Sequence, residues 1–144
     1  MTTHAPTQAT SDGRLDIPGF RGTLIEPGDA GYDDARVVYN GMIDRRPRLI
    51  ARCAGVADVV AAVDAARERG LTLAVLGGGH NAGGLGVWDD ALVVDLSGMR
   101  GVQVDPAGRV VRVEGGALLR DVDGATVPAW PCPSASSPPP VLAG

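Results

Sequence analysis

The chain has 144 residues, of which 44% are apolar and 21% are charged, and its formal net charge is −4. This length and composition are typical of one globular domain with a modest core. The negative charge and the aromatic content of 3% argue against a nucleic-acid partner or an acidic membrane as target. No apolar run approaches the ~20 residues that cross a bilayer, and the N-terminus lacks a signal-peptide pattern. We therefore expect a cytoplasmic protein without a membrane partner.

The first part of the chain predicts a leader followed by a short helix. Residues 1–20 are expected to be a disordered leader, because the first 13 are rich in Thr, Pro, Ser and Gly. Asp33 or Asp34 is expected to cap a helix that reaches about Tyr39. The basic residues Arg45, Arg46 and Arg48 follow. A solvated or ion-paired surface is favoured for them over a phosphate site, because their spacing supports no such site.

A strand, a helix and a second strand come next. The apolar run Leu49–Cys53 predicts the first strand, and Thr72–Leu76 predicts the second. Between them, Ala57–Arg69 carries apolar side chains at helical spacing, and Gly70 stops the helix. The stripe consists of Val59, Val60, Val63 and Ala66. The order predicts a βαβ unit with parallel strands.

The second strand runs directly into a glycine-rich loop, which ends at a further strand, Ala91–Leu96. Within the loop, six glycines fall in ten residues: Gly77, Gly78, Gly79, Gly83, Gly84 and Gly86. A chain accepts this loss of backbone entropy where it must approach something closely or adopt positive φ. Successive N–H groups in such a loop can hold phosphate oxygens. A phosphate-bearing ligand is therefore the first hypothesis.

A Rossmann dinucleotide site is the main alternative for this loop. Gly77, Gly79 and Ala82 fit a shortened G-x-G-x-x-A pattern, and Asp95 lies near the expected acidic position. That site, however, requires a helix that begins in the loop. Only eight residues separate Ala82 from the strand at Ala91, and three of them are glycine. A Rossmann site for NAD is therefore rejected.

Histidine and cysteine give little support for metal or thiol chemistry. The only histidine besides His80 is His4 in the leader, so a histidine-based metal site has no support. From chemistry alone, His80 is a loop residue with backbone hydrogen bonds, although an imidazole there is well placed for cofactor chemistry. Cys53 lies in an apolar run and is interpreted as a buried small hydrophobe. Cys132 belongs to no cluster with metal-ligand spacing.

The remainder of the chain predicts a hairpin, a helix and an irregular tail. Residues 101–105 and 109–114 alternate around the turn Pro106-Ala107-Gly108, and Leu118–Thr126 predicts a short helix. Residues 127–144 are rich in proline and serine and show no periodicity. Such a tail should pack neither as a helix nor as a central strand.

Matches to one family occur in order from about Leu24 to Thr126. They are EPGDAGYDDAR, YNGMIDRRPRLIARC, ADVVAAV, GGGHNAGG, ALVVDLSGMRGVQVDP, VRVEGGA and DVDGAT. This stretch resembles the FAD-linked oxidases of the vanillyl-alcohol oxidase and PCMH superfamily, and most closely the bacterial berberine-bridge-enzyme-like members. The resemblance implies an α+β, PCMH-type FAD-binding fold over residues 21–126, with a βαβ first lobe and the start of a second α/β lobe.

The same resemblance implies the cofactor and the site. FAD is expected with its diphosphate in the glycine loop and with His80 as the covalent tether, as in many members. The implied cofactor-binding residues are Gly77, Gly78, Gly79, His80, Asn81 and Gly83. The implied activity is an oxidase whose flavin accepts hydride from a small organic substrate. No catalytic residue or metal site is assigned, and Cys132 is not taken as a second flavin anchor.

Two departures from the family pattern affect these expectations. Members often carry arginine before the glycines, whereas this chain has Leu76, which removes a cation near the phosphates. After DVDGAT, the proline-rich tail replaces the expected flavin-binding segment. A shift of reading frame at residues 127–144 would restore family-like text, which predicts a truncated oxidase. The alternative is a non-enzymatic remnant that holds no flavin; a nicotinamide-binding Rossmann module ranks below both.

Overall fold

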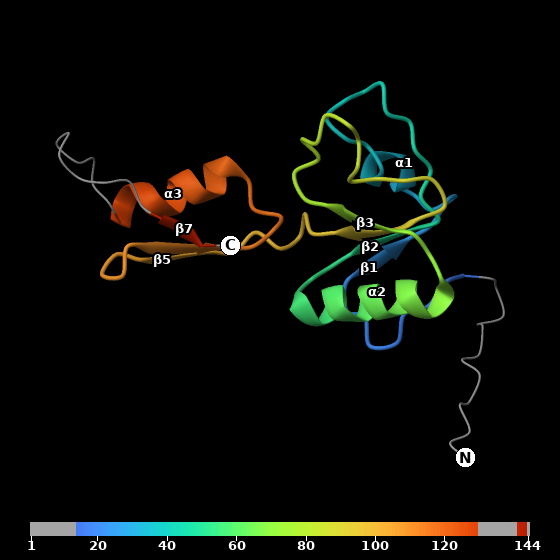
Figure 1. The fold of residues 1–144 in the computed structure, drawn as a ribbon, viewed down its shortest axis with the longest axis horizontal. Helices are drawn as coiled ribbons and strands as arrows, with labels where there is room; N and C mark the ends of the chain where they lie inside the picture. Colours follow the sequence, from blue (N-terminus) through green and yellow to red (C-terminus); the bar gives the residue numbers. More distant parts are fainter. Residues whose placement is uncertain (1–13, 130–140, 144) are drawn as a thin grey trace, which may run out of the picture.

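The computed structural model describes residues 14–129 and 141–143. They form two lobes that lie side by side, each with its own small sheet (Figure 1). We call residues 14–99 the first lobe and residues 100–129 together with 141–143 the second lobe. This arrangement agrees with the expected α+β fold of a βαβ lobe followed by the start of another α/β lobe.

The first lobe is built on a four-stranded sheet. Its strands are β1 (Thr23–Ile25), β2 (Leu49–Arg52), β3 (Leu73–Leu76) and β4 (Leu92–Asp95), in the spatial order β1-β2-β4-β3. Strands β2, β4 and β3 run parallel, and β1 pairs antiparallel at one edge. All four residues of the central strand β4 are buried, which explains why it reads as a continuous apolar run. The expected parallel βαβ unit is confirmed, with β4 inserted between its two strands.

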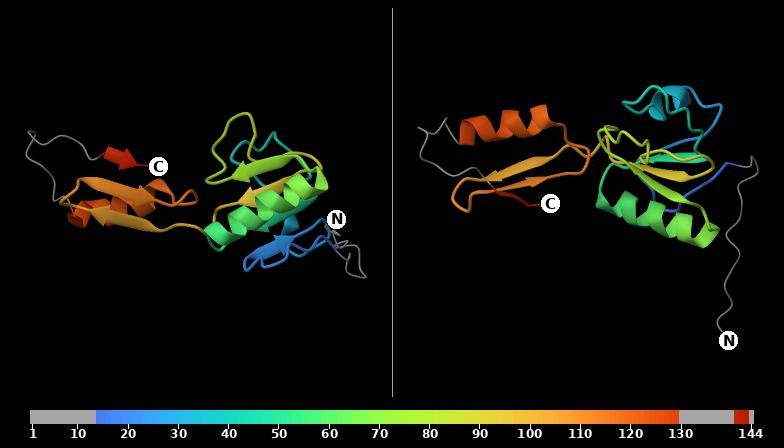
Figure 2. Two further views of the ribbon diagram at one scale, coloured as in Figure 1. Left: turned by 60° about the horizontal axis from the view of Figure 1, so that its bottom comes forward. Right: turned by 45° about the horizontal axis from the view of Figure 1, so that its top comes forward.

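Helices lie on both faces of this sheet (Figures 1 and 2). Helix α2 (Val56–Arg69) buries Ala62, Ala65 and Ala66 in a core with the odd-numbered residues of β2. Helix α1 (Tyr32–Ala35) contributes Tyr32 and Ala35 to the core on the opposite face. The first lobe therefore has a core on each side of its sheet.

The sequence locates α2 correctly but predicts its buried face only in part. Gly70 caps its C-terminus with φ of 63° and donates its N–H to the Ala66 carbonyl, as expected of a stop residue. Ala66 is buried, but Val60 is 55% exposed. Instead, the small alanines face the sheet, because they let the helix pack closely against it.

Two boundaries near the N-terminus also differ from expectation. Helix α1 ends at Ala35 rather than near Tyr39, and its N-cap is Gly31 in a left-handed conformation, without a capping side chain. The expected leader of residues 1–20 is too long, because Ile17 is only 3% exposed and belongs to the core against α2. Residues 1–13 of that leader lie outside the described residues.

The second lobe pairs one hairpin with one helix. Strands β5 (Val102–Asp105) and β6 (Val110–Val113) form the expected antiparallel hairpin, and β7 (Val141–Ala143) pairs parallel with β6 at the edge. Helix α3 (Leu119–Ala129) matches the expected helix but continues three residues past Thr126, so the expected irregular tail begins inside a helix. No helix in the described part of the chain is long and apolar enough to span a membrane.

The main chains of the two lobes approach each other closely. A Cβ built on Gly77 would lie 2.8 Å from the carbonyl oxygen of Gly115, and one built on Gly116 would overlap the carbonyl oxygen of Leu96. Gly116 also donates its N–H to the Met99 carbonyl at 2.9 Å. Only glycine allows backbones to approach this closely. The glycine loop after β3 and the chain entering α3 are thereby held together.

Candidate functional site: a glycine loop between two lobes

The site consists of two segments that lie against each other. We call residues 77–86, after β3, the glycine loop, and residues 37–44, after α1, the facing segment. Tyr39 donates its N–H to the Gly79 carbonyl at 3.0 Å, and the Asn40 side-chain amide donates to the Ala82 carbonyl at 3.1 Å. A Cβ on Gly84, whose φ is +67°, would lie 2.7 Å from the Ile43 side chain. The loop is therefore held through its carbonyl groups and by close packing.

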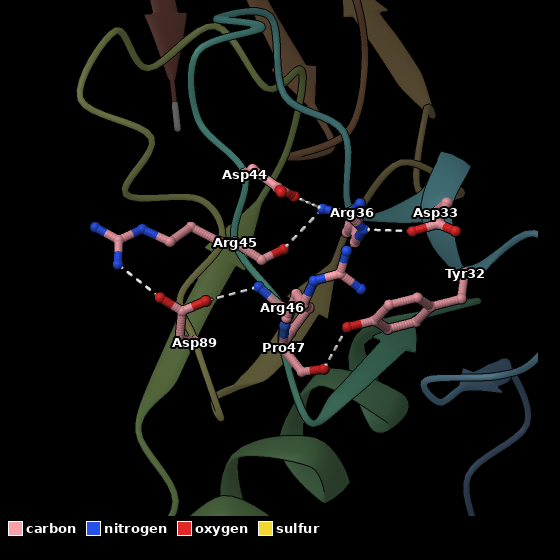
Figure 3. A network of polar contacts seen from close by, with 8 residues as sticks. All are labelled: Tyr32, Asp33, Arg36, Asp44, Arg45, Arg46, Pro47 and Asp89. Atoms are coloured by element: carbon pink, nitrogen blue, oxygen red, sulfur yellow. Dashed lines mark hydrogen bonds and ion pairs between the residues drawn. The ribbon is translucent and has the colours of Figure 1, made fainter.

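Ion pairs hold the facing segment in turn (Figure 3). Arg36 pairs with Asp44 and with Asp33, and it also donates to the Arg45 carbonyl. Hydrogen bonds from Arg36 hold the pKa of the Asp44 carboxyl below its ordinary value. The two ends of the segment are thus fixed to α1, although sequence pattern alone does not reveal this long-range arrangement.

Asp89 holds the first two arginines that follow the segment. Arg45 pairs with Asp89 at 2.6 Å, and its guanidinium lies 4.5 Å from the centre of the Trp88 ring. Asp89 also accepts the N–H of Arg46 at 2.8 Å, and these bonds lower the pKa of its carboxyl (Figure 3). The preference for an ion-paired surface is therefore confirmed at Arg45.

The glycine loop presents backbone donors that nothing in the described chain accepts. Among residues 14–129 and 141–143, no hydrogen bond has an N–H of residues 77–83 as its donor, whereas the carbonyls of Gly79, Asn81 and Ala82 all accept one. Unpaired N–H groups are costly unless water or a ligand satisfies them. A run of such donors suits an anion such as a phosphate, so the loop fits the phosphate-bearing ligand expected from the sequence.

The loop also lies where α/β sheets bind ligands. It follows the carboxyl end of β3, and Arg52 and Asp95 occupy the same position on the parallel strands β2 and β4. A hollow of about 330 Å³ there is lined by Gly77, Gly78 and Gly79 together with those two side chains. Crevices outside the carboxyl ends of parallel strands are the usual ligand sites of this class.

Arg52 supplies a cation in this hollow. Its Nε donates to Oδ2 of Asp95 at 2.8 Å, and the side chain of Asp95 is 1% exposed. Arg52, Asp95 and Leu76 stand in one row across the sheet, so Arg52 lies two strands from Leu76. The sequence analysis did not identify Arg52 as a site residue. Its position could have been predicted, because Arg52 ends a predicted strand parallel to β3.

Two further hollows adjoin the loop. One of about 410 Å³ runs along the free edge of β3 and is lined by His80 and Asn81. The other, of about 600 Å³, lies between the loop and the start of α3, where His80 meets Leu118, Leu119 and Arg120. The His80 side chain therefore borders the space between the lobes.

The six expected site residues all lie in this loop, but they differ in what they offer. His80 is exposed, and its ring lies 5.1 Å from the ring of Tyr39, centre to centre. The side-chain oxygen of Asn81 accepts the N–H of Leu85 at 3.2 Å and so closes the loop. Gly77, Gly78, Gly79 and Gly83 contribute N–H groups without a described acceptor.

The structure also bears on the alternatives. No helix occurs between β3 and β4, all of whose intervening residues are described, so the rejection of a Rossmann site is confirmed. Within the described chain, no group of three His, Cys, Asp or Glu residues could hold a metal ion. Burial raises the pKa of the Cys53 thiol to about 11, in keeping with an inert core cysteine. Cys132 lies outside the described residues.

Comparisons with known proteins identify the fold. The profile of the FAD binding domain family matches residues 47–140. The chain is 37% identical over 103 residues to (R)-6-hydroxynicotine oxidase of Paenarthrobacter nicotinovorans, covering 72% of this chain and 22% of that protein. It is 29% identical to berberine bridge enzyme-like 9 of Arabidopsis thaliana over 58% of this chain and 16% of the relative.

A solved structure agrees with these sequence matches. The crystal structure of 6-hydroxy-D-nicotine oxidase from Arthrobacter nicotinovorans superposes with a TM-score of 0.76 at 34% identity, covering 81% of this chain and 26% of that one. The chain thus spans about a fifth to a quarter of the length of these relatives. The chain belongs to the FAD binding domain family, and FAD is its cofactor.

Proposed function

We propose that the glycine loop binds the diphosphate of FAD through the N–H groups of residues 77–83. The observation that carries this proposal is the run of backbone donors without a described acceptor, placed at the carboxyl ends of parallel strands. Arg52 lies in the same hollow, where its Nε is paired with Asp95, so it adds guanidinium donors to the site but no net charge. Gly77, Gly78, Gly79, His80, Asn81 and Gly83 are the proposed cofactor-binding residues.

We further propose that His80 is the covalent tether of the flavin. Its imidazole is exposed and borders the hollow between the glycine loop and α3. In the attachment, an imidazole nitrogen of His80 loses its proton and bonds to the 8α carbon of the flavin, which loses one hydrogen. Dioxygen accepts the two electrons and two protons and leaves as hydrogen peroxide.

The activity proposed for the protein to which this portion belongs is that of an oxidase. The bound flavin supplies hydride acceptance, and the relatives named as oxidases support an organic small-molecule substrate. Within this chain, the loop orients the cofactor, and no residue is assigned to substrate chemistry. The cytoplasmic location stays a prediction from the sequence.

The shifted reading frame at residues 127–144 is a separate hypothesis. We propose residues 21–126 as part of a PCMH-type domain, followed by a tail read in a shifted frame. The family match continues to residue 140, so the boundary at 126 needs its own test. Sequencing the gene decides it, since an unbroken frame through codons 127–144 would refute the shift.

A titration with three ligands tests the diphosphate site. We expect FAD to bind the purified chain, ADP to compete with it, and riboflavin to bind at least about tenfold more weakly because it lacks the phosphates, which corresponds to about 1.4 kcal/mol. Gly83→Asp should weaken FAD binding by a similar factor through charge repulsion. Gly124→Asp in α3 is the matched control and should bind as the wild type does. Equal affinity for riboflavin would contradict the proposal.

Gel fluorescence tests the tether. After incubation with FAD and oxygen, flavin fluorescence should stay with the denatured wild-type chain and be absent from His80→Ala. His4→Ala removes the chain's other histidine and should leave the fluorescence unchanged. Fluorescence that survives in His80→Ala would refute this assignment while leaving the diphosphate site intact.

A further inference from the structure

Tyr39 is an exposed aromatic residue at the centre of the site. Its side chain is 78% exposed, although an apolar ring of this size ordinarily gains from burial. The ring is nevertheless in contact with one neighbour, because its centre lies 5.1 Å from that of the His80 imidazole, with the planes inclined at 41°. This separation and tilt fall within the range that aromatic pairs prefer.

The main chain of Tyr39 is fixed although its ring is exposed. Its N–H donates to the Gly79 carbonyl at 3.0 Å, directly next to His80. The neighbouring Asn40 bonds to the Ala82 carbonyl on the other side of His80. The facing segment therefore contacts the glycine loop both before and after the histidine, and the ion pairs of Arg36 and Asp89 anchor that segment (Figure 3).

The two rings stand where the three hollows meet. Tyr39 lines the hollow at the carboxyl ends of the strands, His80 lines the other two, and Gly78 lines all three. Apart from Tyr39, the described chain places no other aromatic ring against the His80 side chain. The imidazole thus has one side against Tyr39, lies close to Gly78 and is otherwise exposed.

We propose that Tyr39 is a positioning residue, which holds the imidazole of His80 in the orientation needed for covalent attachment of the flavin. This inference rests on the proposed tether at His80. The contact is made by the ring, because no hydrogen bond of the Tyr39 hydroxyl occurs within the described chain. Without the ring, the exposed imidazole samples several rotamers, and only part of that population presents its nitrogen correctly.

The first test needs no flavin. In the NMR spectrum of the 144-residue chain, we expect nuclear Overhauser effects between the two rings and ring-current shifts of the His80 imidazole protons, assigned with His80→Ala. The shifts should vanish in Tyr39→Ala and persist in Tyr39→Phe. Met42→Ala removes another exposed side chain of the facing segment and should leave them unchanged. Absence of the inter-ring effects in the wild type would overturn the inference.

The second test measures the rate of covalent attachment after FAD is added, together with the amount of FAD bound. Tyr39→Ala should slow attachment at least about tenfold, as expected of a misplaced reacting group, with FAD binding unchanged. Tyr39→Phe and Met42→Ala should react at the wild-type rate. If the wild-type chain binds FAD but forms no covalent bond with it, the tether at His80 is refuted instead. Attachment at equal rates in wild type and Tyr39→Ala, or slow attachment in Tyr39→Phe, would refute the role of the Tyr39 ring alone.

Discussion

The two lobes differ in how much of their structure they bury. In the first lobe every residue of β4 is buried, and helices cover both faces of the sheet. In the second lobe, β5 has no fully buried residue, and Val111 is the buried position of β6. Since burial of apolar surface is the main source of stability, the first lobe should carry most of the folding free energy, while the second contributes a wall of the site.

Truncating one leucine in each lobe gives the largest expected contrast. Leu92 in β4 is 0% exposed and Leu119 in α3 is 76% exposed. Leu92→Ala should lower the free energy of unfolding by about 2–5 kcal/mol, whereas Leu119→Ala should stay within about 0.5 kcal/mol. Urea titration monitored by circular dichroism measures both. Similar losses in the two variants would show that the lobes are equally important to stability.

Adding one methyl group at the contact between the lobes should have an intermediate effect. Gly116→Ala places a Cβ on the Leu96 carbonyl, which should cost about 1–3 kcal/mol, as overpacking does. Gly124→Ala is the matched control within α3, where a Cβ meets nothing within 4 Å. That change should stabilise the helix by about 0.5–1 kcal/mol. If both substitutions prove neutral, the lobes do not touch in solution as they do here.

Acid should weaken the first lobe through Asp58, and this is the smallest of the three effects. The carboxylate accepts the N–H groups of Arg21 and Ala54, which lower its pKa in the folded state. Its contribution is therefore present above the unfolded-state pKa of about 3.9 and is lost as the pH falls through the lower folded-state value.

Unfolding at pH 7 and near pH 3 checks this expectation. Asp58→Asn should lose less stability than the wild type between these two pH values, because its side chain no longer titrates. Asp64→Asn, which removes an exposed carboxylate of the same helix, should retain the wild-type pH dependence. A pH dependence unchanged by Asp58→Asn would exclude this residue as the source.

Local patterns explain which parts of the fold could be predicted. The helix at 56–69, the hairpin and the parallel strands each follow from periodicity and turn residues within a short window. The inward face of α2 could not be read in the same way, because valine is more apolar than alanine, yet close helix–sheet packing places Ala62 and Ala65 inward. Hydrophobicity alone does not distinguish these faces.

In the candidate site, too, the parts that are local in sequence could be predicted more easily than the parts that come from distant segments. The glycine loop is contiguous in sequence, so its composition identifies it directly. Arg52 and Tyr39 reach it from segments 25 and 38 residues before Gly77, respectively, through the sheet register and through a hydrogen bond to Gly79. The predicted parallel strands could have placed Arg52 at this end of the sheet, whereas no sequence pattern marks the facing segment, with Tyr39, as a partner of the loop.

The glycine contact between the lobes has a consequence for redesign. The carbonyl of Gly115 abuts Gly77 and Gly116 abuts Leu96, so this part of the contact has no side chain to shorten, whereas Leu118, Leu119 and Arg120 line the hollow beside His80. Larger cofactor analogues would therefore be accommodated by shortening one of those three side chains, with the glycine contact left intact. The glycines thus set how closely the two backbones approach, and the side chains at the start of α3 border the space beside His80.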